Sequence, residues 1–341
     1  MHMDIFNDDA FSLSAMTAAV EKMPSVPGFL GSLGIFGQGE GVPTDTVTVE
    51  RKDMILSPIP TSQRGTEPPM GSTEKAVLRS FSIPRVAKSD QVFAREIANV
   101  RAFGTEGDLV TAAQVIAQKQ AKLLQEYELT MELHRLGAVQ GILLDTDAST
   151  LYNYFTEFGI TQPAEIDFDL DNASPTSGAL RSLISNSVTR PIARALGAAW
   201  NPGVRILGLA GDTFFDQFVN HADVVRTYEG WMAAENLRAG TAFETFRFGG
   251  VEWVNYKGTD DNSTVAIGAG KVQFIVLGVP GLYRRINGPG ESLETVNTIG
   301  RPIYSELVRD LKRNQWVQPE IYSYPLHMVT RPEVLLRGKN T

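Results

Sequence analysis

The stretch that decides the fold is TDTVTVE at residues 44–50, in which β-branched and polar residues alternate. Alternation at period two predicts a strand with one apolar side, and the apolar run at 54–56 extends it. A matching run, AVLRSFSIP, follows at residues 76–84, after a tip rich in proline and glycine. Proline has no backbone N–H to give to a sheet, so such a tip suits a sheet edge or a free-standing ribbon. The sequence therefore predicts a long hairpin over residues 44–84.

This hairpin carries apolar side chains that need a cover, because an isolated two-stranded hairpin is only marginally stable in water. The apolar positions are Val47, Val49, Ile55, Leu78, Phe81 and Ile83. We expect neighbouring copies of the same chain to cover them, with charged residues setting the register of the contact. The candidate contact residues are Arg51, Lys52, Arg64, Glu67, Glu74, Lys75 and Arg79. An ordinary surface hairpin packed on its own domain is the alternative.

A long amphipathic helix is predicted after the hairpin, over residues 108–136. This stretch contains no proline and no glycine, and its apolar residues recur at spacings of three and four. At the standard rise per residue the helix would be roughly 40 Å long. Asp108 suits its start, and His134, Arg135 and Gly137 suit its end. Because the apolar residues do not keep a heptad, a structural spine is favoured over a coiled coil.

Composition argues against several classes of protein. The chain has 341 residues, 43% of them hydrophobic, and no apolar run approaches the ~20 residues of a membrane span. It contains no cysteine, so disulfides and thiolate chemistry are ruled out. The acidic N-terminus lacks the basic and then apolar order of a secretory signal. A formal net charge of −8 argues against a protein that wraps nucleic acid, although an acidic surface can face packaged nucleic acid without sticking to it.

Several motifs suggest an enzyme or a metal site, but each departs from the sequence pattern that such a site requires. Residues 167–172, DFDLDN, resemble the start of a calcium loop, but Asn172 and Gly178 stand where Gly and Glu are required. A half-buried strand explains this alternation better. The GAGK at 268–271 precedes a predicted strand, whereas a phosphate loop follows one. The histidines at 2, 134, 221 and 327 lack ligand spacing. We predict no catalytic residue, no cofactor and no metal site, although a Ser-His-Asp triad assembled in space stays open.

The rest of the chain mixes helical and strand patterns. We expect a helix at 179–196 bent by Pro191, a buried strand at 204–209, helices from 212 and 222, and a strand at 272–277. Turns are predicted at 145–147 and at Gly249-Gly250. Two strand-like segments, 316–329 and 333–336, close the chain. Their long separation from the earlier strands predicts a domain inserted within another.

The order of these segments resembles that of a known family. A Gly-rich N-terminal arm, extended hairpin, spine helix, mixed α/β body and returning strands together resemble the major capsid proteins of lambda-like tailed phages, the capsid protein E family. The most specific pieces are ILSPI at 55–59 with Arg64-Gly65, and the ending at 304–336 with its aromatic strand and Pro-Glu-Val segment. The resemblance covers essentially the whole chain in order.

This resemblance implies an α+β fold of the Hong Kong ninety-seven viral capsid type. The implied parts are an N-terminal arm at 1–43, an extended loop at 44–85, a peripheral domain at 86–172 with the spine helix at 108–136, an axial domain at 173–284, and a return to the peripheral domain at 285–341. The cross-linking chemistry of some relatives, an isopeptide between Lys and Asn, is not assigned to Lys52 or Lys75 because it depends on geometry.

The function that the resemblance implies is that of a major capsid protein. Copies of the chain would assemble in the host cytoplasm, as hexamers and pentamers, into the icosahedral shell of a virion. The implied partners are a scaffold, a portal and decoration or cement proteins, and the shell would enclose double-stranded DNA without reading its sequence. Two alternatives stay open: another self-assembling virion or tail protein, and a soluble α/β enzyme.

Overall fold

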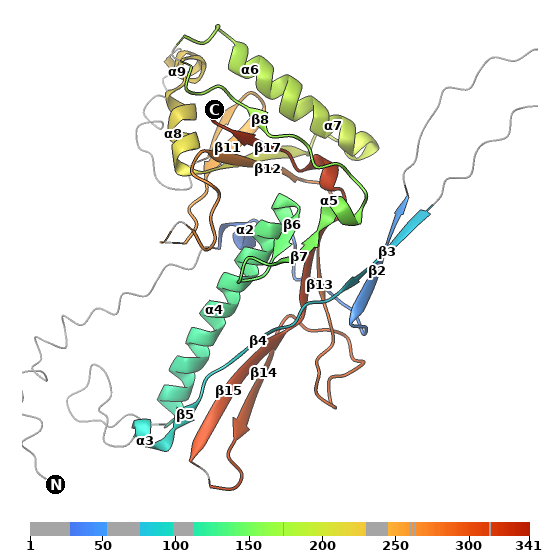
Figure 1. Cartoon of the computed structure of the whole chain (residues 1–341), viewed down its shortest axis with the longest axis vertical. Helices are drawn as coiled ribbons and strands as arrows, with labels where there is room; N and C mark the ends of the chain where they lie inside the picture. Colours follow the sequence, from blue (N-terminus) through green and yellow to red (C-terminus); the bar gives the residue numbers. More distant parts are fainter. Residues whose placement is uncertain are drawn as a thin grey trace, which may run out of the picture.

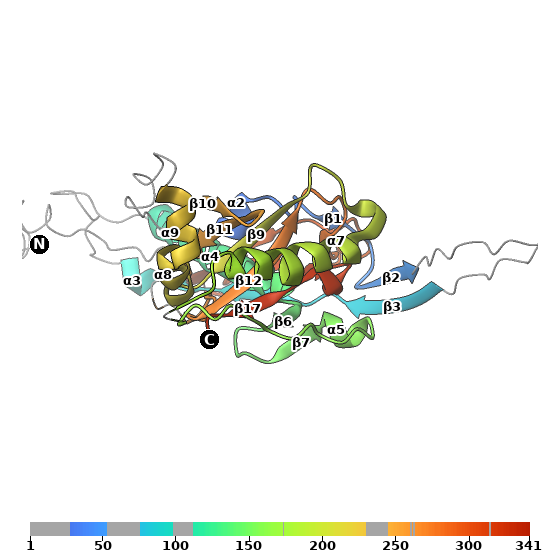
Figure 2. The same ribbon diagram turned by 90° about the horizontal axis from the view of Figure 1, so that it is seen from above.

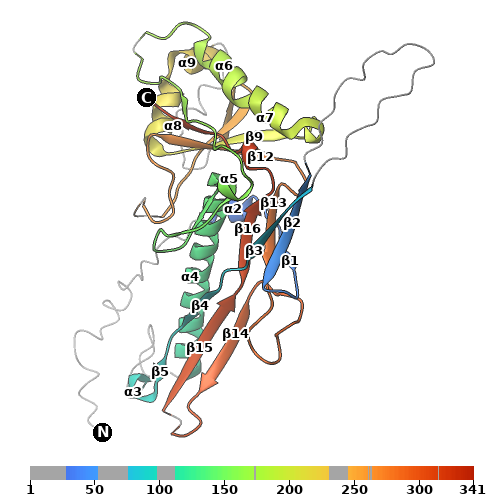
Figure 3. The same ribbon diagram turned by 45° about the vertical axis from the view of Figure 1, so that its right-hand side comes forward.

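The computed structural model describes residues 28–52, 76–97, 112–172, 174–229, 245–259, 261, 263–313 and 315–341. These residues form an elongated molecule with two units that mix helices and sheets (Figure 1). The upper unit is built on a six-stranded sheet, and the lower unit on one long helix beside a three-stranded and a four-stranded sheet. A separate two-stranded hairpin lies along the side of the lower unit (Figure 3).

The lower unit draws its elements from both ends of the chain. They are α2 (Phe29–Ser32), β1 (Glu40–Gly41), β2 (Thr46–Lys52), β3 (Ala76–Ser82), β4 (Val86–Ser89), β5 (Val92–Phe93), α3 (Ala94–Ile97), α4 (Ala112–Gln140), β13 (Tyr283–Asn287), β14 (Tyr304–Arg309), β15 (Trp316–Ser323) and β16 (Pro325–Val329). A small sheet of β6 (Ile142–Leu144) and β7 (Thr150–Asn153) lies with α5 (Tyr154–Glu157) where the two units meet.

The upper unit holds the remaining elements. They are β8 (Ile166–Asp167), α6 (Ala179–Leu183), the π-helix η3 (Ile184–Thr189), α7 (Arg190–Leu196), η4 (Gly197–Ala199), β9 (Arg205–Ala210), α8 (Asp212–Asn220), α9 (Ala222–Glu229), β10 (Thr245–Phe248), β11 (Val251–Asn255), β12 (Lys271–Leu277), η5 (Pro332–Val334) and β17 (Arg337–Lys339). Seen from above, α7 and α8 lie at opposite ends of this unit (Figure 2).

The predicted hairpin is confirmed for the residues that the structure describes. Strands β2 and β3 pair antiparallel, with Val47 opposite Phe81 and Arg51 opposite Val77. The alternation of β-branched and polar residues that opens at Thr46 therefore forms a ribbon with two distinct faces. The predicted extension and the Pro-rich tip, residues 53–75, lie outside the described residues.

The long helix α4 is the spine of the lower unit. Leu123, Tyr127 and Met131 of its apolar stripe are buried, whereas Leu124 is 46% exposed. The predicted end near Gly137 is wrong, because the helix continues to Gln140. Gly137 instead gives room to the returning chain: a Cβ there would lie 2.9 Å from the backbone oxygen of Ile142. The predicted first residues, 108–111, lie outside the described residues.

The six-stranded sheet has the order β10-β11-β9-β12-β17-β8. Its turn at Gly249-Gly250 is confirmed, with φ of 65° and 85° at the two glycines, values that few other residues adopt. The predicted helix at 179–196 forms as α6, η3 and α7 in direct succession, and Pro191 is the second residue of α7, directly after the π-helical stretch. Its π-helical stretch was not predicted.

The predicted last strand is wrong in position. Residues 332–334 form the short helix η5, in which Val334 is fully buried, and the strand follows only at Arg337–Lys339. Proline at 332 suits the first position of such a turn. Strand β17 then pairs with β12 and with β8, so this sheet also takes strands from outside the predicted range 173–284.

An aromatic cluster forms the core of the upper unit. Trp253 on β11 stacks on Phe218 of α8 with ring centroids 4.0 Å apart. Phe214, Phe168 and Phe274 pack around the same indole at 5.6 to 6.1 Å. Offset and edge-to-face ring pairs of this kind add to the stability that burial already gives. This core fixes α8 and the 168–172 segment against the sheet.

Candidate functional site

The base of the hairpin is covered by its own chain. Phe81 on β3 is fully buried, with ring centroids 5.4 Å from Tyr152, 6.1 Å from Tyr154 and 5.9 Å from Phe158. The Ser82 N–H donates to the Tyr152 hydroxyl, which donates back to the Ser82 carbonyl, at 2.9 and 2.8 Å. The expectation that a neighbouring copy covers the apolar side of the hairpin is therefore wrong for Phe81 and Val49, which are buried in the core of their own chain. Val47 and Ile83 are partly buried against the same core.

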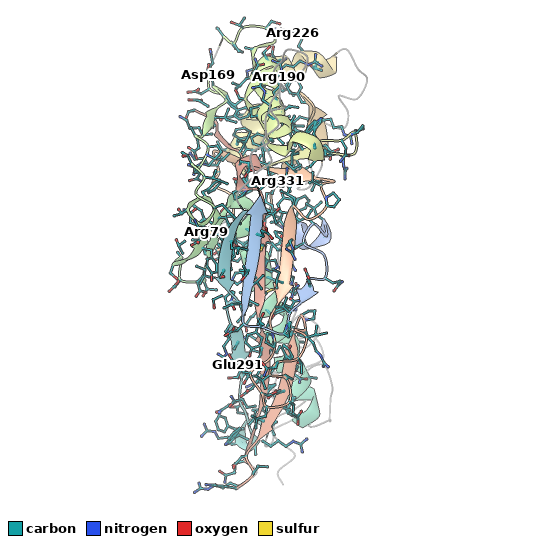
Figure 4. All side chains as sticks on the ribbon, turned by 90° about the vertical axis from the view of Figure 1, so that its right-hand side faces the viewer. Arg79, Asp169, Arg190, Arg226, Glu291 and Arg331 are labelled. Atoms are coloured by element: carbon teal, nitrogen blue, oxygen red, sulfur yellow. The ribbon has the colours of Figure 1, made fainter. Side chains whose placement is uncertain are left out.

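The opposite face of the hairpin is exposed. Leu78, near the distal end of β3, is 65% exposed. Glu50, which pairs with Leu78 across the ribbon, and Arg79, the next residue along β3, are exposed as well. Figure 4 shows Arg79 along the side of the lower unit. Of the other predicted contact residues, Arg51 and Lys52 lie on β2, in the same ribbon as Arg79. Residues Arg64, Glu67, Glu74 and Lys75 lie outside the described residues.

A segment of the chain that we call the N-terminal strap, residues 28–42, is bound along the lower unit. Phe36 packs edge-on to His327, with ring centroids 5.1 Å apart. Strand β1 pairs in parallel with β13. Val42 N–H donates to the Asn287 carbonyl at 2.9 Å, and its own carbonyl accepts from Gly300 N–H at 3.1 Å. The sequence analysis predicted an arm here but not these contacts.

Glu132 joins the strap to both units. Its carboxylate is fully buried in the spine helix and accepts hydrogen bonds from the backbone N–H groups of Leu30 at 2.7 Å and Gly31 at 3.1 Å. Arg135 donates to it at 3.2 Å, and the Tyr256 hydroxyl, which follows β11 of the upper unit, donates at 3.4 Å. The only signal in the sequence is an acid directly beside the apolar position Met131.

Buried cationic and imidazole groups surround this junction. Arg285 is 8% exposed and donates to the Tyr127 hydroxyl at 2.9 Å and to Asn287 at 3.0 Å, both neutral partners. The rings of His134 and His327 lie 6.2 Å apart. Burial lowers the pKa of His134 to about 4, and burial together with the nearby charge of Arg285 lowers the pKa of His327 well below its ordinary value. Both imidazoles are therefore neutral at pH 7.

The segments considered for catalysis or metal binding have structural roles. Phe168 and Leu170 are buried, whereas Asp167, Asp169 and Asp171 are exposed, so the predicted alternation is confirmed, although β8 itself is short. Within the described ranges, no group of three or more His, Cys, Asp or Glu residues is arranged to hold a metal ion. The GAGK segment forms the turn before β12, as predicted, and Lys271 pairs with Glu165 at 2.7 Å.

His221 directly follows α8. Its Nδ1 accepts a hydrogen bond from the Asp223 backbone N–H at 3.2 Å. The side chain of Asp223 in turn accepts from the backbone N–H groups of Gly178 and Leu180, at the start of α6. Both residues therefore connect helices in the upper unit. In the part of the chain that the structure describes, no helix is long and apolar enough to cross a membrane.

Known proteins resemble this chain over nearly its full length. The family described as phage major capsid protein E matches residues 12–340. The major capsid protein of Pseudomonas phage KPP10 is 25% identical over 350 residues, which cover 96% of this chain and 97% of that protein. The major capsid protein of Salmonella phage Felix O1 is 24% identical over 357 residues, which cover 96% and 95%.

Solved structures share the fold. The capsid of Myoviridae phage XM1 is similar with a TM-score of 0.52 at 12% identity, over 94% of this chain and 94% of that chain. The mature capsid of bacteriophage PhiM1 gives a TM-score of 0.51 at 12% identity, over 90% of this chain and 84% of that chain. The predicted α+β fold of the Hong Kong ninety-seven type is confirmed. The chain belongs to the phage major capsid protein E family.

Proposed function

We propose that copies of this major capsid protein close into an icosahedral shell of hexamers and pentamers, and that the distal hairpin of each copy rests on its neighbour. The observation that carries the proposal is the contrast between the two faces of the ribbon: Phe81 and Val49 are buried on their own body, whereas Leu78, on the opposite face, is 65% exposed. A ribbon of two strands is too thin to bury side chains by itself. A second copy is the cover that a repeating shell offers.

The charged residues of the hairpin give that contact its register. Arg79 is exposed on β3, and Arg51, Lys52, Arg64, Glu67, Glu74 and Lys75 follow toward the predicted tip. Exposed ion pairs at the rim of an interface favour the correct partner and orientation more than they add affinity. We expect reversal of these charges to lower the accuracy of assembly while leaving the subunit folded.

We infer that the two units are the two domains that we predicted from the sequence. In this proposal the lower unit, with α4 and the strands from 285 onward, is the peripheral domain, and the upper unit is the axial domain around which each ring closes. Because β8 and β17 pair within the upper sheet, the proposed axial domain includes 166–167 and 337–339 beside 173–284. Rings that close require contacts between different surfaces of identical copies.

The remaining parts of the proposal concern partners and location. The shell encloses double-stranded DNA without reading its sequence, it assembles in the host cytoplasm with a scaffold and a portal, and decoration proteins bind its outside. Membership of the capsid protein E family supports these roles. The net charge of −8 supports an enclosing shell that does not wrap the genome tightly.

Deletion of residues 63–72 tests the hairpin's role. The expected result is folded subunits that fail to form closed shells, as seen by electron microscopy and sedimentation. Leu78→Asp is the matching point variant within the described residues, and we expect the same loss because a charge replaces an exposed apolar contact. Leu124→Asp, at a position 46% exposed on α4, is its control for an added surface charge. Normal shells from both hairpin variants would contradict the proposal.

A further inference from the structure

One helical face of the upper unit is basic in an otherwise acidic protein. Between Asp171 and Asp212 the chain contains no acidic residue but four arginines. Three of them, Arg181, Arg190 and Arg194, are exposed on α6 and α7. The formal net charge of the whole chain is −8, so this face stands out from its surroundings. We call the α7 end of it, Arg190, Arg194 and Trp200, the basic end.

The basic end has the composition of a protein interface. Trp200, directly after η4, is a large aromatic residue that is 37% exposed. Arg190 donates to the side chain of Asn186, and no described carboxylate forms an ion pair with Arg190 or Arg194. Trp and Arg are the residues most often found to dominate the energy of protein interfaces. A phosphate-binding surface would need the arginines but not the exposed indole.

An acidic surface lies at the other end of the same unit. It consists of Asp169 and Asp171, in the segment after β8, and of Asp212 and Asp216, on α8; all of them are exposed. The two parts are held together because the Leu170 N–H donates to the Asn340 carbonyl, and the Asn340 side chain donates to Gln217 of α8 at 2.8 Å. We call this set the acidic end.

The two ends are placed for a head-to-tail contact. Helices α7 and α8 lie at opposite sides of the upper unit in both the front view and the view from above (Figures 1 and 2). A single copy therefore cannot pair its own basic and acidic ends. Two copies related by a rotation can do so, and each copy then offers a free end to the next one.

We propose that the basic end of one copy packs against the acidic end of the next, and that this contact closes the ring of upper units. The inference rests on the proposed shell function and names the surfaces that its rings use. Heterologous contacts of this kind close when the rotation between copies is a whole fraction of a turn. Opposite charges at the two ends favour this orientation over its reverse, which would bring like charges together.

Charge reversal and its rescue test this contact. The basic reversal is Arg190→Glu with Arg194→Glu, the acidic reversal is Asp171→Lys with Asp216→Lys, and the combined variant carries all four substitutions and keeps the original net charge. Each chain is produced in bacteria, and closed shells are counted by electron microscopy after sedimentation. We expect each reversal alone to lower the shell yield about tenfold or more, and the combined variant to return to within about threefold of the original chain.

Two further variants sharpen the test. Trp200→Ala removes the exposed indole and is expected to lower the shell yield in the same way, with an unchanged circular dichroism spectrum. Lys257→Glu reverses an exposed charge that lies outside both ends and is expected to leave the yield unchanged. Shells also become less frequent as salt rises, because exposed charge pairs are screened.

Three results would overturn the proposal. One is a normal shell yield from both reversals. Another is a combined variant that stays as defective as the single reversals, which would mean that the two ends bind different partners. The third is a basic reversal that forms shells normally while the acidic reversal does not, which would mean that Arg190 and Arg194 do not make the contact. Failure of the original chain to form any closed shell, even when it is produced together with its scaffold, would instead count against the proposed function.

Discussion

Glu132→Gln is the most informative single substitution, because it changes one charge at the point where the strap, the spine helix and the upper unit meet. The carboxylate is fully buried and accepts from Leu30, Gly31, Arg135 and Tyr256. Glutamine has nearly the same shape, so no cavity forms. It keeps one accepting oxygen and turns the other acceptor into a donating NH₂ group.

The size of the effect follows from these contacts. If the amide oxygen keeps Leu30 and Tyr256, the new NH₂ group faces the Gly31 N–H and the Arg135 guanidinium, which are both donors. Hydrogen bonds to charged groups contribute roughly 1.5–3 kcal/mol each, and breaking a buried ion pair from one side costs about 3–5 kcal/mol. Arg135 lies on the same helix as Glu132, so the strap itself loses the charged hydrogen bond to Gly31 and keeps only a neutral one to Leu30; we therefore expect about 3 kcal/mol less free energy to hold the strap in place.

Hydrogen exchange followed by mass spectrometry measures this loss locally. A loss of about 3 kcal/mol corresponds to roughly hundredfold faster exchange in the strap peptide that contains Leu30 and Gly31. Glu128→Gln is the matched control on the same helix, because Glu128 is 56% exposed and lies 3.8 Å from Arg135. Its exchange is expected to stay within about threefold of the original chain. Equal exchange in Glu132→Gln and Glu128→Gln would refute the reasoning.

Three more outcomes are expected. Phe81→Ala removes a fully buried ring and is expected to lower the free energy of unfolding, measured in urea, by about 3–5 kcal/mol. Leu78→Ala, at a position 65% exposed, is expected to lower it by less than about 1 kcal/mol, and equal losses would contradict the described hairpin base. Gly39→Ala places a Cβ 2.5 Å from the Asn287 side chain at a φ of +89° and is expected to speed proteolysis in the strap, whereas Gly28→Ala, with open space, is not. Burial lowers the pKa of His134 from 6.5 to about 4, so the unfolded chain takes up a proton at a higher pH than the folded chain does. The free energy of unfolding therefore falls as the pH drops from about 6.5 to 4, by up to about 1.4 kcal/mol per pH unit. Urea unfolding of His134→Gln at pH 7 and pH 4.5 is expected to show a smaller loss, and an identical loss would exclude His134 as its cause.

The sequence by itself determined the elements whose pattern is local. The alternation at 46–52, the spacing of apolar residues along α4 and the glycine pair at 249–250 each report a backbone conformation that neighbouring residues decide. The order of these elements along the chain also resembles that of the family to which the chain belongs. The sequence places the end of α4 too early, because a glycine at 137 suits a helix stop, whereas in the fold Gly137 leaves room for the chain that returns at Ile142.

Only the tertiary structure decided which distant residues meet. Glu132 caps a turn that lies 102 residues earlier, His134 lies beside His327, and Phe81 is buried in an aromatic group from its own chain. Strand β17 likewise joins β12 across the chain. The physical reason is that periodicity shows that a residue needs a partner, but the path of the whole chain decides which residue the partner is. For the exposed Leu78 and for the basic and acidic ends, that partner is proposed to come from another copy.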